Sequence, residues 1–483
     1  MRPYSIGEIL GIMDARLEHG DPSLLISGVT SDSRKAASGD LFCALVGDRV
    51  DGHDYVAEVF RKGARAAIIE HPVPGLTEFL NVEDPGRRFA LLSVSSTVKA
   101  LQALAASYRG ELPTKVIGIT GSVGKTSTKD LVCSVLREQF SAFGNPGNLN
   151  SHVGLPLAVL QIDGAPDYAV LEMAMRARGE IAELCAIAKP EIAVLTDISV
   201  SHIGVLGSIE EIALAKAEIL NALPSGGAAI ASGDNEWVRK MGASSGRDVI
   251  YYGLSEGCHV RGVDQVSLGA DGSRFRVELS GPVARMAEMV TAGPMEFRVK
   301  APGLHQVHNA LAAVAIGLVT GVPYEKMRHG LENAAMSAMR LQILNHSGIT
   351  IINDAYNASP KSMRSALDLL NEIGAQRKVA VLGDMLEMGS HGPDAHREVG
   401  RLAAARASYL CCSGELAKEI KAGWDATLGT GSSSWFPDKS SLSRFLGGFL
   451  VPGDTVLVKA SRGMGFESVV ASLTGGREVE HHD

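Results

Sequence analysis

The chain has 483 residues, of which 45% are hydrophobic and 21% are charged, and its formal net charge is −8. This length predicts several domains of about 100–200 residues each. The weak acidic balance, without a basic run, argues against nucleic-acid binding. The six cysteines form no C-x-x-C pair, which argues against a zinc site or a disulfide scaffold and favours a reducing compartment.

The N-terminal segment and the apolar runs predict a protein without a membrane span. Residues 1–20 carry early acidic groups and no apolar core, so they do not predict a signal peptide. The longest apolar run, residues 310–319, is shorter than the about 20 residues that a helix needs to cross a bilayer. We therefore expect a cytoplasmic protein, and we take a monomer as its expected state.

Three segments follow one another along the chain. Residues 1–112 predict a small α/β domain, and residues 113–328 predict a larger domain in which short apolar strands alternate with helical stretches. Such strands are typical of a parallel sheet that is buried on both faces. Residues 240–300 differ, because they predict a β insertion. Residues 329–483 alternate again and predict a second doubly wound α/β domain.

The predicted fold class is therefore α/β with three domains. A central P-loop-type parallel sheet is flanked by a small N-terminal α/β domain and a C-terminal Rossmann-like domain. The candidate strands of the last two domains, outside the β insertion, are residues 114–120, 168–172, 191–196, 349–354, 378–384, 408–412 and 454–461.

The stretch VIGITGSVGKTSTKDLV, residues 116–132, combines a strand, a glycine-rich turn and a helix start. Gly124, Lys125 and Thr126 match the end of the P-loop signature G-x-x-x-x-G-K-[ST], but Ile119 stands where the first glycine would fall. The backbone N–H groups would bind an anion, Lys125 would approach the β and γ phosphates, and Thr126 could bind Mg²⁺. A glycine-rich turn with an incidental lysine is the alternative, which the flanking strand and helix disfavour. The missing glycine leaves the class of nucleotide-using protein open.

Two candidate metal ligands follow the next strands. Glu172 ends the strand 168–172, and the carboxyl ends of strands in such sheets surround the ligand crevice. A carboxylate there could bind Mg²⁺ through oxygen, although a glutamate at a strand end is usually solvated. His202 lies just past the following strand, where a histidine is more often a surface or structural residue. On the residues alone, both interpretations stay open.

Lys216 occupies an unusual place in the helix that GSIEEIALAKAEILNAL predicts. Ser208 begins the capping pattern S-x-x-E at the start of this helix. Lys216 falls on its apolar stripe, four residues after Ile212 and four before Leu220. Burial would lower the pKa of the lysine and make the neutral amine available, for example to form a carbamate with CO₂. A lysine at the edge of the stripe that reaches water fits the spacing equally well.

These stretches together resemble the Mur ligase family, over nearly the whole chain. The loop matches the family's T-G-x-x-G-K-T form. Residues 147–156, GNLNSHVGLP, look like its G-N-x-N-N-x-x-G-x-P segment, with serine in place of the second asparagine of the pair. The ATP-binding loop that the resemblance implies consists of Thr120, Gly121, Ser122, Val123, Gly124, Lys125 and Thr126. The Mg²⁺ ligands that it implies are Thr126, Glu172, His202 and carbamylated Lys216.

Two nucleotide contacts are implied by segments farther along the chain. Residues 303–313, GLHQVHNALAA, resemble the motif G-x-H-N-x-x-N-x-L-A-A. The resemblance implies that Asn309 contacts adenine, while Gln306 replaces the usual asparagine of the motif. Arg340, in MRLQ, matches an arginine that reaches the nucleotide from the third domain.

The last motifs concern the subtype. Residues 353–363, NDAYNASPKSM, resemble D-D-S-Y-N-A-N-P-x-S-M, which implies a nucleotide-side role for Asp354 and Tyr356. The Ser-Pro pair of this segment also predicts a helix start. Together with residues 381–389, VLGDMLEMG, this segment looks like the subtype that adds D-Ala-D-Ala. The D-N-P-R signature of the subtype that adds the third residue does not occur in the third domain.

The resemblance implies the whole reaction. The protein would join D-Ala-D-Ala to UDP-N-acetylmuramoyl-tripeptide in peptidoglycan synthesis, with ATP and Mg²⁺ and through an acyl phosphate. The implied catalytic groups are Lys125, Lys216, His202 and Glu172. The stretch 31–55 resembles the uridine-nucleotide region, which implies that Ser33 and Arg34 lie near the UDP end, although D-S-R alone is only a charged turn.

Three alternatives remain at this point. A related ligase would add a single amino acid to a UDP-muramoyl peptide, or glutamate to folate. A P-loop ATPase would hydrolyse ATP without forming an amide, and the missing loop glycine and near-neutral composition disfavour it. A non-catalytic nucleotide-binding module would not need the whole set of implied catalytic groups.

Overall fold

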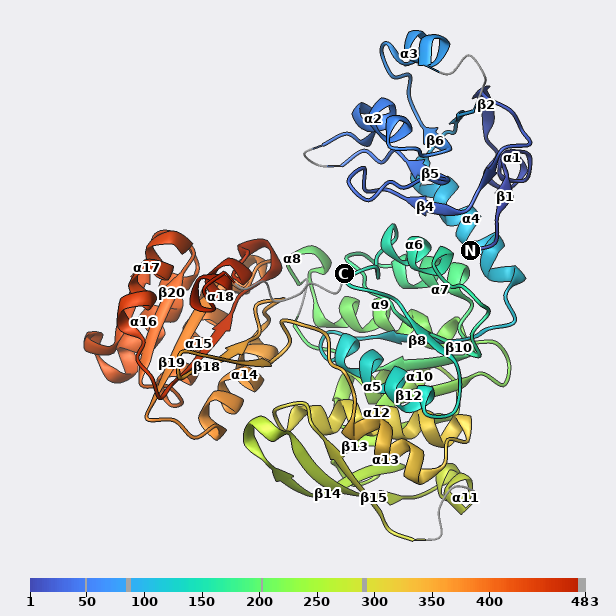
Figure 1. The fold of residues 1–483 in the computed structure, drawn as a ribbon. Helices are drawn as coiled ribbons and strands as arrows, with labels where there is room; N and C mark the ends of the chain where they lie inside the picture. The colour runs from blue at the N-terminus through green and yellow to red at the C-terminus, as the bar shows by residue number, and fades with distance from the viewer. Residues whose placement is uncertain (48–49, 84–87, 201–202, 289–292, 477–483) are drawn as a thin grey trace. The chain divides into compact units, whose positions relative to one another are not determined.

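The computed structural model describes residues 1–47, 50–83, 88–200, 203–288 and 293–476 (Figure 1). The strands of these residues form four sheets of two, five, six and nine strands. The chain divides into two compact units. The first unit comprises Met1–Gly118, Ser141–Met175 and Glu180–Glu191, and the second comprises Ile119–Phe140, Arg176–Gly179 and Ile192–Asp483.

The N-terminal part of the first unit is built on the five-stranded sheet, in the order β2-β7-β6-β5-β4. Strands β4 to β7 are parallel, and β2 pairs with β7 in the antiparallel sense. The strands are β2 (Arg16–His19), β4 (Gly28–Thr30), β5 (Asp40–Cys43), β6 (Ala66–Ile69) and β7 (Ala90–Ser93), with a separate pair β1 (Tyr4–Ser5) and β3 (Leu25–Ile26). The helices are α1 (Ile6–Met13), η1 (Gly52–Tyr55), α2 (Val56–Arg61), α3 (Leu76–Glu83) and α4 (Thr97–Glu111).

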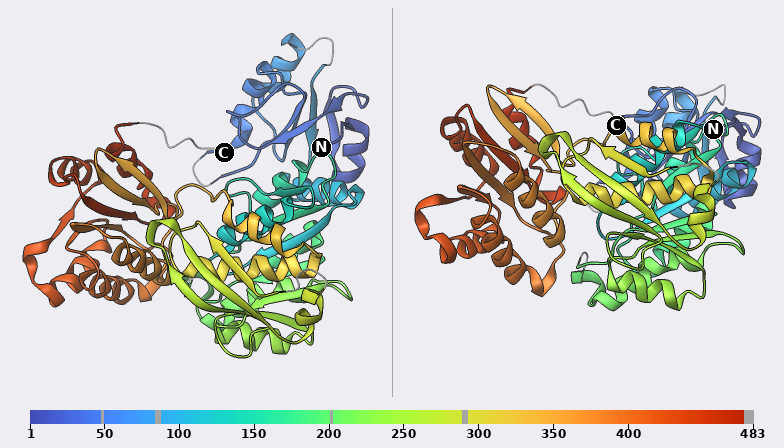
Figure 2. Two further views of the ribbon diagram at one scale, coloured as in Figure 1. Left: turned by 60° about the horizontal axis from the view of Figure 1, so that its bottom comes forward. Right: turned by 90° about the horizontal axis from the view of Figure 1, so that it is seen from below.

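The nine-stranded sheet has the order β16-β15-β14-β13-β12-β11-β8-β10-β9. Strand β10 pairs with β9, and strands β11 to β14 pair with one another, all in the parallel sense, which confirms the parallel pairing predicted for the runs 168–172 and 191–196; β15 and β16 continue the sheet in the antiparallel sense. Residues 240–300, which the sequence predicts as a β insertion, do contain strands, but these strands, β13 to β16, continue the main sheet to its edge, because β13 pairs with β12 (Figure 2). The strands are β8 (Lys115–Thr120), β9 (Ala142–Gly144), β10 (Tyr168–Glu172), β11 (Ile192–Leu195), β12 (Ala228–Ser232), β13 (Val249–Gly253), β14 (Val260–Ser267), β15 (Ser273–Leu279) and β16 (Met295–Val299).

The helices of this middle segment include one that explains the longest apolar run. Residues 310–319 lie in α12 (His305–Thr320), which is buried along almost its whole length, and a helix that is apolar all round belongs in a core. Across the described residues, the structure contains no helix with the length and apolarity that crossing a membrane requires. The other helices are α5 (Lys125–Arg137), α6 (Gly154–Leu160), α7 (Glu180–Ala188), α8 (Ile203–Leu206), α9 (Ile209–Asn221), α10 (Glu236–Ser244), α11 (Pro282–Glu288) and α13 (Tyr324–Glu332).

The C-terminal segment is a doubly wound sheet in the order β17-β18-β22-β19-β20-β21, parallel except for β17 (Figure 1, orange to red). Alternate residues of β19 face two separate cores: Ala380 and Leu382 pack with α14 to α16, while Val379 and Val381 pack with α17 and α18. The elements are β17 (Gln342–His346), β18 (Ile349–Asn353), α14 (Pro360–Glu372), β19 (Arg377–Gly383), α15 (Gly392–Ala404), β20 (Tyr409–Ser413), α16 (Ala417–Leu428), β21 (Ser433–Phe436), α17 (Lys439–Phe449), β22 (Asp454–Lys459) and α18 (Glu467–Leu473). The predicted α/β fold class is confirmed.

Candidate active site

The glycine-rich turn forms a strand–loop–helix unit in which β8 ends at Thr120 and α5 begins at Lys125. Gly124 is the N-cap of α5 with a φ of 91°, a left-handed conformation that glycine adopts without strain. The first N–H groups of a helix have no partner inside the helix and attract anions. The strand, the turn and the helix start are confirmed, whereas ATP binding by this loop stays a prediction.

Two close approaches explain why glycine is needed in this loop. A Cβ atom on Gly121 would lie 2.0 Å from Thr196 Oγ1, and one on Gly124 would lie 2.7 Å from Asn309 Oδ1. Thr196 also anchors the loop, because its hydroxyl donates to the main-chain oxygen of Val123 at 2.7 Å. The loop is thus held rigidly against neighbouring segments, which preserves the direction of its N–H groups.

The lysine and threonine of the loop lie where an anion would meet them. Lys125 Nζ donates to the main-chain oxygen of Gly121 at 2.8 Å, so the ammonium group folds back over the loop. Thr126 follows in the first turn of α5 and is 3% exposed. The contact of Lys125 with phosphate and that of Thr126 with Mg²⁺ stay predictions.

Asn309 reaches the same loop from α12. Its Oδ1 accepts a hydrogen bond from Thr128 Oγ1 at 3.3 Å, and its Nδ2 donates to Gln306 Oε1 at 2.7 Å. Gln306, which departs from the asparagine of the family motif, therefore orients the amide of Asn309. The structure brings Asn309 beside Gly124, whereas a contact with adenine stays a prediction.

Lys216 is buried on α9, with 2% of its surface exposed. Burial is the main cause that lowers its pKa well below the ordinary value; the charge of Lys125 lowers the pKa further, and Asp197 opposes this effect. Ser208 caps the helix by accepting from the main-chain N–H of Glu211 at 3.2 Å. The buried interpretation of Lys216 is confirmed, and its carbamylation stays a prediction.

Asp197 is a residue of this region that the sequence reasoning missed. It follows β11, and its main-chain oxygen accepts from the N–H of Ser122 in the loop at 2.8 Å. Its carboxylate accepts from Asn235 Nδ2 at 2.9 Å and from Ser199 Oγ at 2.7 Å, and it pairs with Lys361 Nζ at 2.5 Å. The sequence alone offers no signal that marks Asp197, because an aspartate directly after a strand is an ordinary charged residue.

Glu172 belongs to the first unit, where two asparagines hold it. Its side chain is buried with the rest of β10, and Glu172 Oε1 accepts from Asn150 Nδ2 at 2.8 Å. Asn145 Oδ1 accepts from the main-chain N–H of Glu172 at 2.8 Å. The carboxylate is therefore positioned rather than solvated, and Asn150 comes from the segment 147–156 that the sequence singled out. His202 lies outside the described residues.

Arg340, Tyr356 and Asp354 form one group in the second unit. The guanidinium of Arg340 lies 4.1 Å from the ring centroid of Tyr356, and that of Arg462 lies 5.5 Å from it. Asp354 pairs with the buried Lys459, with Oδ2 and Nζ 2.5 Å apart. Burial raises the pKa of Asp354, while the positive charges of Lys459 and Arg340 oppose this shift. The predicted nucleotide-side residues of the third domain are thus neighbours.

Ser33 and Arg34 lie just after β4, at the carboxyl end of the five-stranded sheet. Asp32 holds the Arg34 guanidinium with two hydrogen bonds, to Nε at 2.8 Å and to Nη2 at 2.7 Å. Lys62 Nζ donates to the main-chain oxygen of Ser33 at 2.9 Å. The turn therefore places an arginine, paired with Asp32, at the end of the sheet where ligands of parallel sheets bind.

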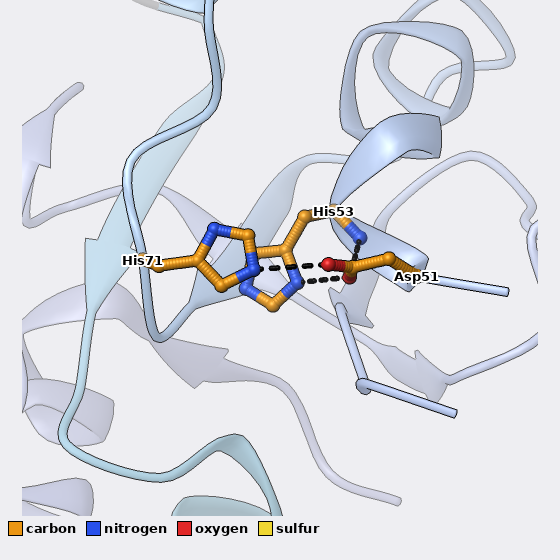
Figure 3. A group of neighbouring side chains, drawn as sticks. All are labelled: Asp51, His53 and His71. Atoms are coloured by element: carbon orange, nitrogen blue, oxygen red, sulfur yellow. Dashed lines mark hydrogen bonds and ion pairs between the residues drawn. The ribbon is translucent and has the colours of Figure 1, made fainter. Parts of the chain in front are cut away.

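One further group at this edge has the composition of a metal site: Asp51, His53 and His71 (Figure 3). His71 Nδ1 lies 3.2 Å from the carbonyl oxygen of Pro72, and its Nε2 lies 3.0 Å from Asp51 Oδ2, so both nitrogens face acceptors, which favours the protonated ring and raises the pKa of His71. His53 Nε2 accepts from the N–H of Glu70 at 3.0 Å, so its proton lies on Nδ1, 2.6 Å from Asp51 Oδ1. The nitrogens facing Asp51 therefore carry protons, which a metal ion would have to displace.

The fold is α/β, and its strand–loop–helix turn has the geometry of an anion-binding loop. Three family models match the chain in order: "Mur ligase family, catalytic domain" at residues 25–109, "Mur ligase middle domain" at 119–317, and "Mur ligase, glutamate ligase domain" at 339–462. The chain belongs to the Mur ligase family.

Named relatives match over nearly the full length. A Bacillus subtilis protein named UDP-N-acetylmuramoyl-tripeptide--D-alanyl-D-alanine ligase is 36% identical over 452 residues, 93% of either chain. The protein of the same name from Escherichia coli is 30% identical over 98% of this chain and 99% of its own. Among solved structures, MurF from Acinetobacter baumannii has a TM-score of 0.84 at 28% identity, covering 98% of this chain and 99% of that one. MurF ligase from Thermotoga maritima in complex with ADP has a TM-score of 0.75 at 27% identity, covering 93% and 97%.

Proposed function

We propose that this protein is an ATP-dependent ligase that joins D-Ala-D-Ala to UDP-N-acetylmuramoyl-tripeptide and so makes the UDP-muramoyl-pentapeptide of peptidoglycan synthesis. The observation that carries the proposal is the whole-chain similarity to relatives named for this reaction, at 30–36% identity. The anion-binding loop, with Lys125 folded over it, supplies the site that ATP needs. We infer that the protein works in the cytoplasm as a monomer, without nucleic acid as a partner.

The roles of the loop residues follow from their positions. Thr120 to Thr126 form the loop around the phosphates, with the N–H groups at the start of α5 directed at them while that of Ser122 holds the loop to Asp197, and Lys125 exchanges the Gly121 carbonyl for the β and γ phosphates. Asn309 binds adenine, held in place by Gln306. Arg340 and Asp354 act on the nucleotide from the C-terminal segment, and Ser33 and Arg34 bind the UDP end of the other substrate. We propose three domains with separate roles. Residues 1–112 bind the UDP-substrate, residues 113–328 bind ATP, and residues 329–483 close over the nucleotide.

Mg²⁺ fits the donor atoms of the proposed site. The hydroxyl of Thr126 and the positioned carboxylate of Glu172 are hard oxygen donors, which this ion prefers. The proposed ligands are Thr126, Glu172, His202 and Lys216, the last as its carbamate. The ion would neutralise charge on the phosphate oxygens during transfer. Because burial lowers the pKa of Lys216, its neutral amine, the form that reacts with CO₂, is favoured more than in a surface lysine.

The chemistry activates a carboxylate before an amine attacks it. A carboxylate oxygen of the tripeptide attacks the γ-phosphorus of ATP, the bond to the β-phosphate oxygen breaks, and ADP leaves. The amine of D-Ala-D-Ala then attacks the acyl carbon of the acyl phosphate, inorganic phosphate leaves, and the nitrogen loses a proton. The protein positions the groups and neutralises charge, so no nucleophilic side chain is required.

Phosphate release is the direct test of this function. The assay contains ATP, Mg²⁺ and UDP-N-acetylmuramoyl-tripeptide, and D-Ala-D-Ala, D-Ala, L-Lys and L-Glu are added one at a time. We expect release that only the dipeptide stimulates, with a UDP-pentapeptide product by mass spectrometry. Stimulation by a single amino acid would assign a related ligase instead, and release without any amine would indicate an ATPase.

A further inference from the structure

Asp197 places a negative charge directly against the phosphate loop. Its side chain is 6% exposed, and its main-chain oxygen accepts the N–H of Ser122. A Cβ atom on Gly121 would lie 2.8 Å from the main-chain nitrogen of Asp197, so the loop and this residue are in close contact. The carboxylate itself interacts with the charge of the buried Lys216, so it adds a negative charge to the region of the loop, where charges interact strongly because water is excluded.

The neutral neighbours of Asp197 hold it but do not cancel its charge. Asn235 Nδ2 and Ser199 Oγ donate to the two carboxylate oxygens. The cation in direct contact is Lys361, whose Nζ lies 2.5 Å from Asp197 Oδ1. Two further amines lie near this carboxylate, those of Lys125 and Lys216. The charge of Lys125 lowers the pKa of Lys216, and that of Asp197 raises it.

The position of Lys361 within α14 does not by itself explain a lysine there, whereas its contact with Asp197 does. Ser359 caps α14 and Pro360 begins it, so Lys361 lies in the first turn. A positive charge there is opposed by the positive end of the helix dipole. The helix therefore gives no reason for a lysine at this position, and the ion pair with Asp197 does. The pair also joins the start of α14 to the loop, across 164 residues of sequence.

We propose that Lys361 is a positioning residue for nucleotide binding: it neutralises Asp197 beside the phosphate loop and anchors the start of α14 there. The inference rests on the proposed role of the loop as the ATP site. Lys361 acts through Asp197 and not by touching the nucleotide. Removing the charge of Lys361 therefore weakens nucleotide binding only while Asp197 is charged. The effects of substituting Lys361 and Asp197 on the binding free energy are then non-additive.

Calorimetric titration with Mg·ADP tests the coupling on the full chain. We expect K361M to raise the Kd for Mg·ADP by about tenfold, a size that contacting pairs commonly show. K361R keeps the charge and stays near the wild-type Kd. D197N binds at least as tightly as wild type, and the double variant D197N/K361M binds like D197N alone. Lys418, which is similarly exposed and pairs with Glu415, provides the matched control, K418M, with an unchanged Kd.

The outcomes separate this inference from the function on which it rests. If wild type binds Mg·ADP and K361M binds equally tightly, the inference is overturned and the proposed function stands. An equal loss from K361M in the wild-type and D197N backgrounds would show that Lys361 contacts the nucleotide itself, which also overturns it. No binding by wild type would overturn both. Thermal unfolding of each variant shows whether a loss of binding is a loss of fold, and K361M changes an exposed side chain that the core does not need.

Discussion

At the scale of single residues, burial decides which chemical form a side chain takes. Lys216 has its amine surrounded by α9 and the neighbouring core, and the nearby Lys125 adds a second reason for it to lose its proton. An ordinary surface lysine stays charged and unreactive toward CO₂. The difference between the two environments, rather than the residue type, is what makes a carbamate at Lys216 chemically reasonable.

The first prediction concerns this carbamate. K216A should lower ligase activity by at least the roughly 10–100-fold that follows loss of a group supporting a metal site. Short carboxylic acids, which can occupy the space of the missing side chain, should restore part of the activity. K240A, a change at an exposed lysine of α10, should neither lose activity nor respond to the acids. A folded K216A that the acids do not rescue would contradict the carbamate.

A second prediction uses the imidazolium of His71. Its hydrogen bond to the Pro72 carbonyl and its ion pair with Asp51 raise its pKa, while the pKa of Asp51 is lowered to about 2, so the aspartate stays charged. A raised pKa in the folded state means that the stabilisation is fully present below the ordinary value of 6.5 and is lost as the pH rises through the raised value.

The measurement is thermal unfolding of wild type and H71Q at about pH 5.5 and about pH 8.5. We expect H71Q to lower the melting temperature more at the acidic pH, because only there does wild type have the charged ring. H391Q, at an exposed histidine of the helix Gly389–His391, should show no such pH dependence. A pH-independent difference for H71Q would contradict the assigned protonation states.

Single residues also show how much of the candidate site could be predicted from the sequence. The place of Lys216 on the apolar stripe with Ile212 and Leu220 was predictable from helical spacing, but the spacing left open whether its amine is buried or reaches water. The meeting of Asp197 and Lys361 was not predictable, because each alone is an ordinary charged residue at the end of a strand or the start of a helix. Only the folded chain brings them together. The spacing of apolar residues predicts which face of a helix or strand is buried. It does not predict which charged residues, distant in the sequence, form an ion pair in the folded chain.

At the scale of elements, two helices of the C-terminal segment pack unusually closely. A Cβ atom on Gly400 of α15 would lie 2.0 Å from the main-chain oxygen of Ile420 in α16, and one on Gly423 of α16 would lie 2.0 Å from that of Arg397. Neither glycine has a positive φ, so packing and not backbone conformation requires them. Small residues let helix backbones approach. The positions of the strands and helices could be predicted from apolar runs in the sequence. The close contact between α15 and α16 could not, because it depends on which surfaces of the two helices face each other.

The third prediction tests this contact. G400A should lower the free energy of unfolding by about 1–3 kcal/mol, because the added methyl group overpacks the interface. G447A in α17 is the matched control, since Gly447 is a helical glycine with no atom within 4 Å of an added Cβ. It should be neutral or stabilise by up to about 1 kcal/mol, the helix preference of alanine over glycine. Denaturant unfolding measures both, and equal effects would show that the helices can move apart freely.

At the scale of the whole molecule, the proposed reaction needs water to be excluded. An acyl phosphate hydrolyses readily, so its lifetime depends on a closed site. The residues proposed to act on the nucleotide from the C-terminal segment, Arg340 and Asp354, belong to a separate doubly wound sheet. The sequence predicted this sheet from its alternating apolar strands. It could not predict a change of arrangement, because closure depends on contacts that form only with ligands present.

Small-angle scattering tests the closure. With a non-hydrolysable ATP analogue, Mg²⁺ and both substrates, the radius of gyration should fall toward the about 23 Å of a compact chain of this length. R340M should compact less, because the Arg340 guanidinium is the group proposed to reach the nucleotide from the C-terminal segment. The analogue alone should compact the protein less than the full set, since closure draws on the binding free energy of every ligand that contacts both sides. An unchanged radius of gyration at saturating ligand would show that the acyl phosphate is protected without domain closure, and the water-excluding surface would then have to lie within one domain.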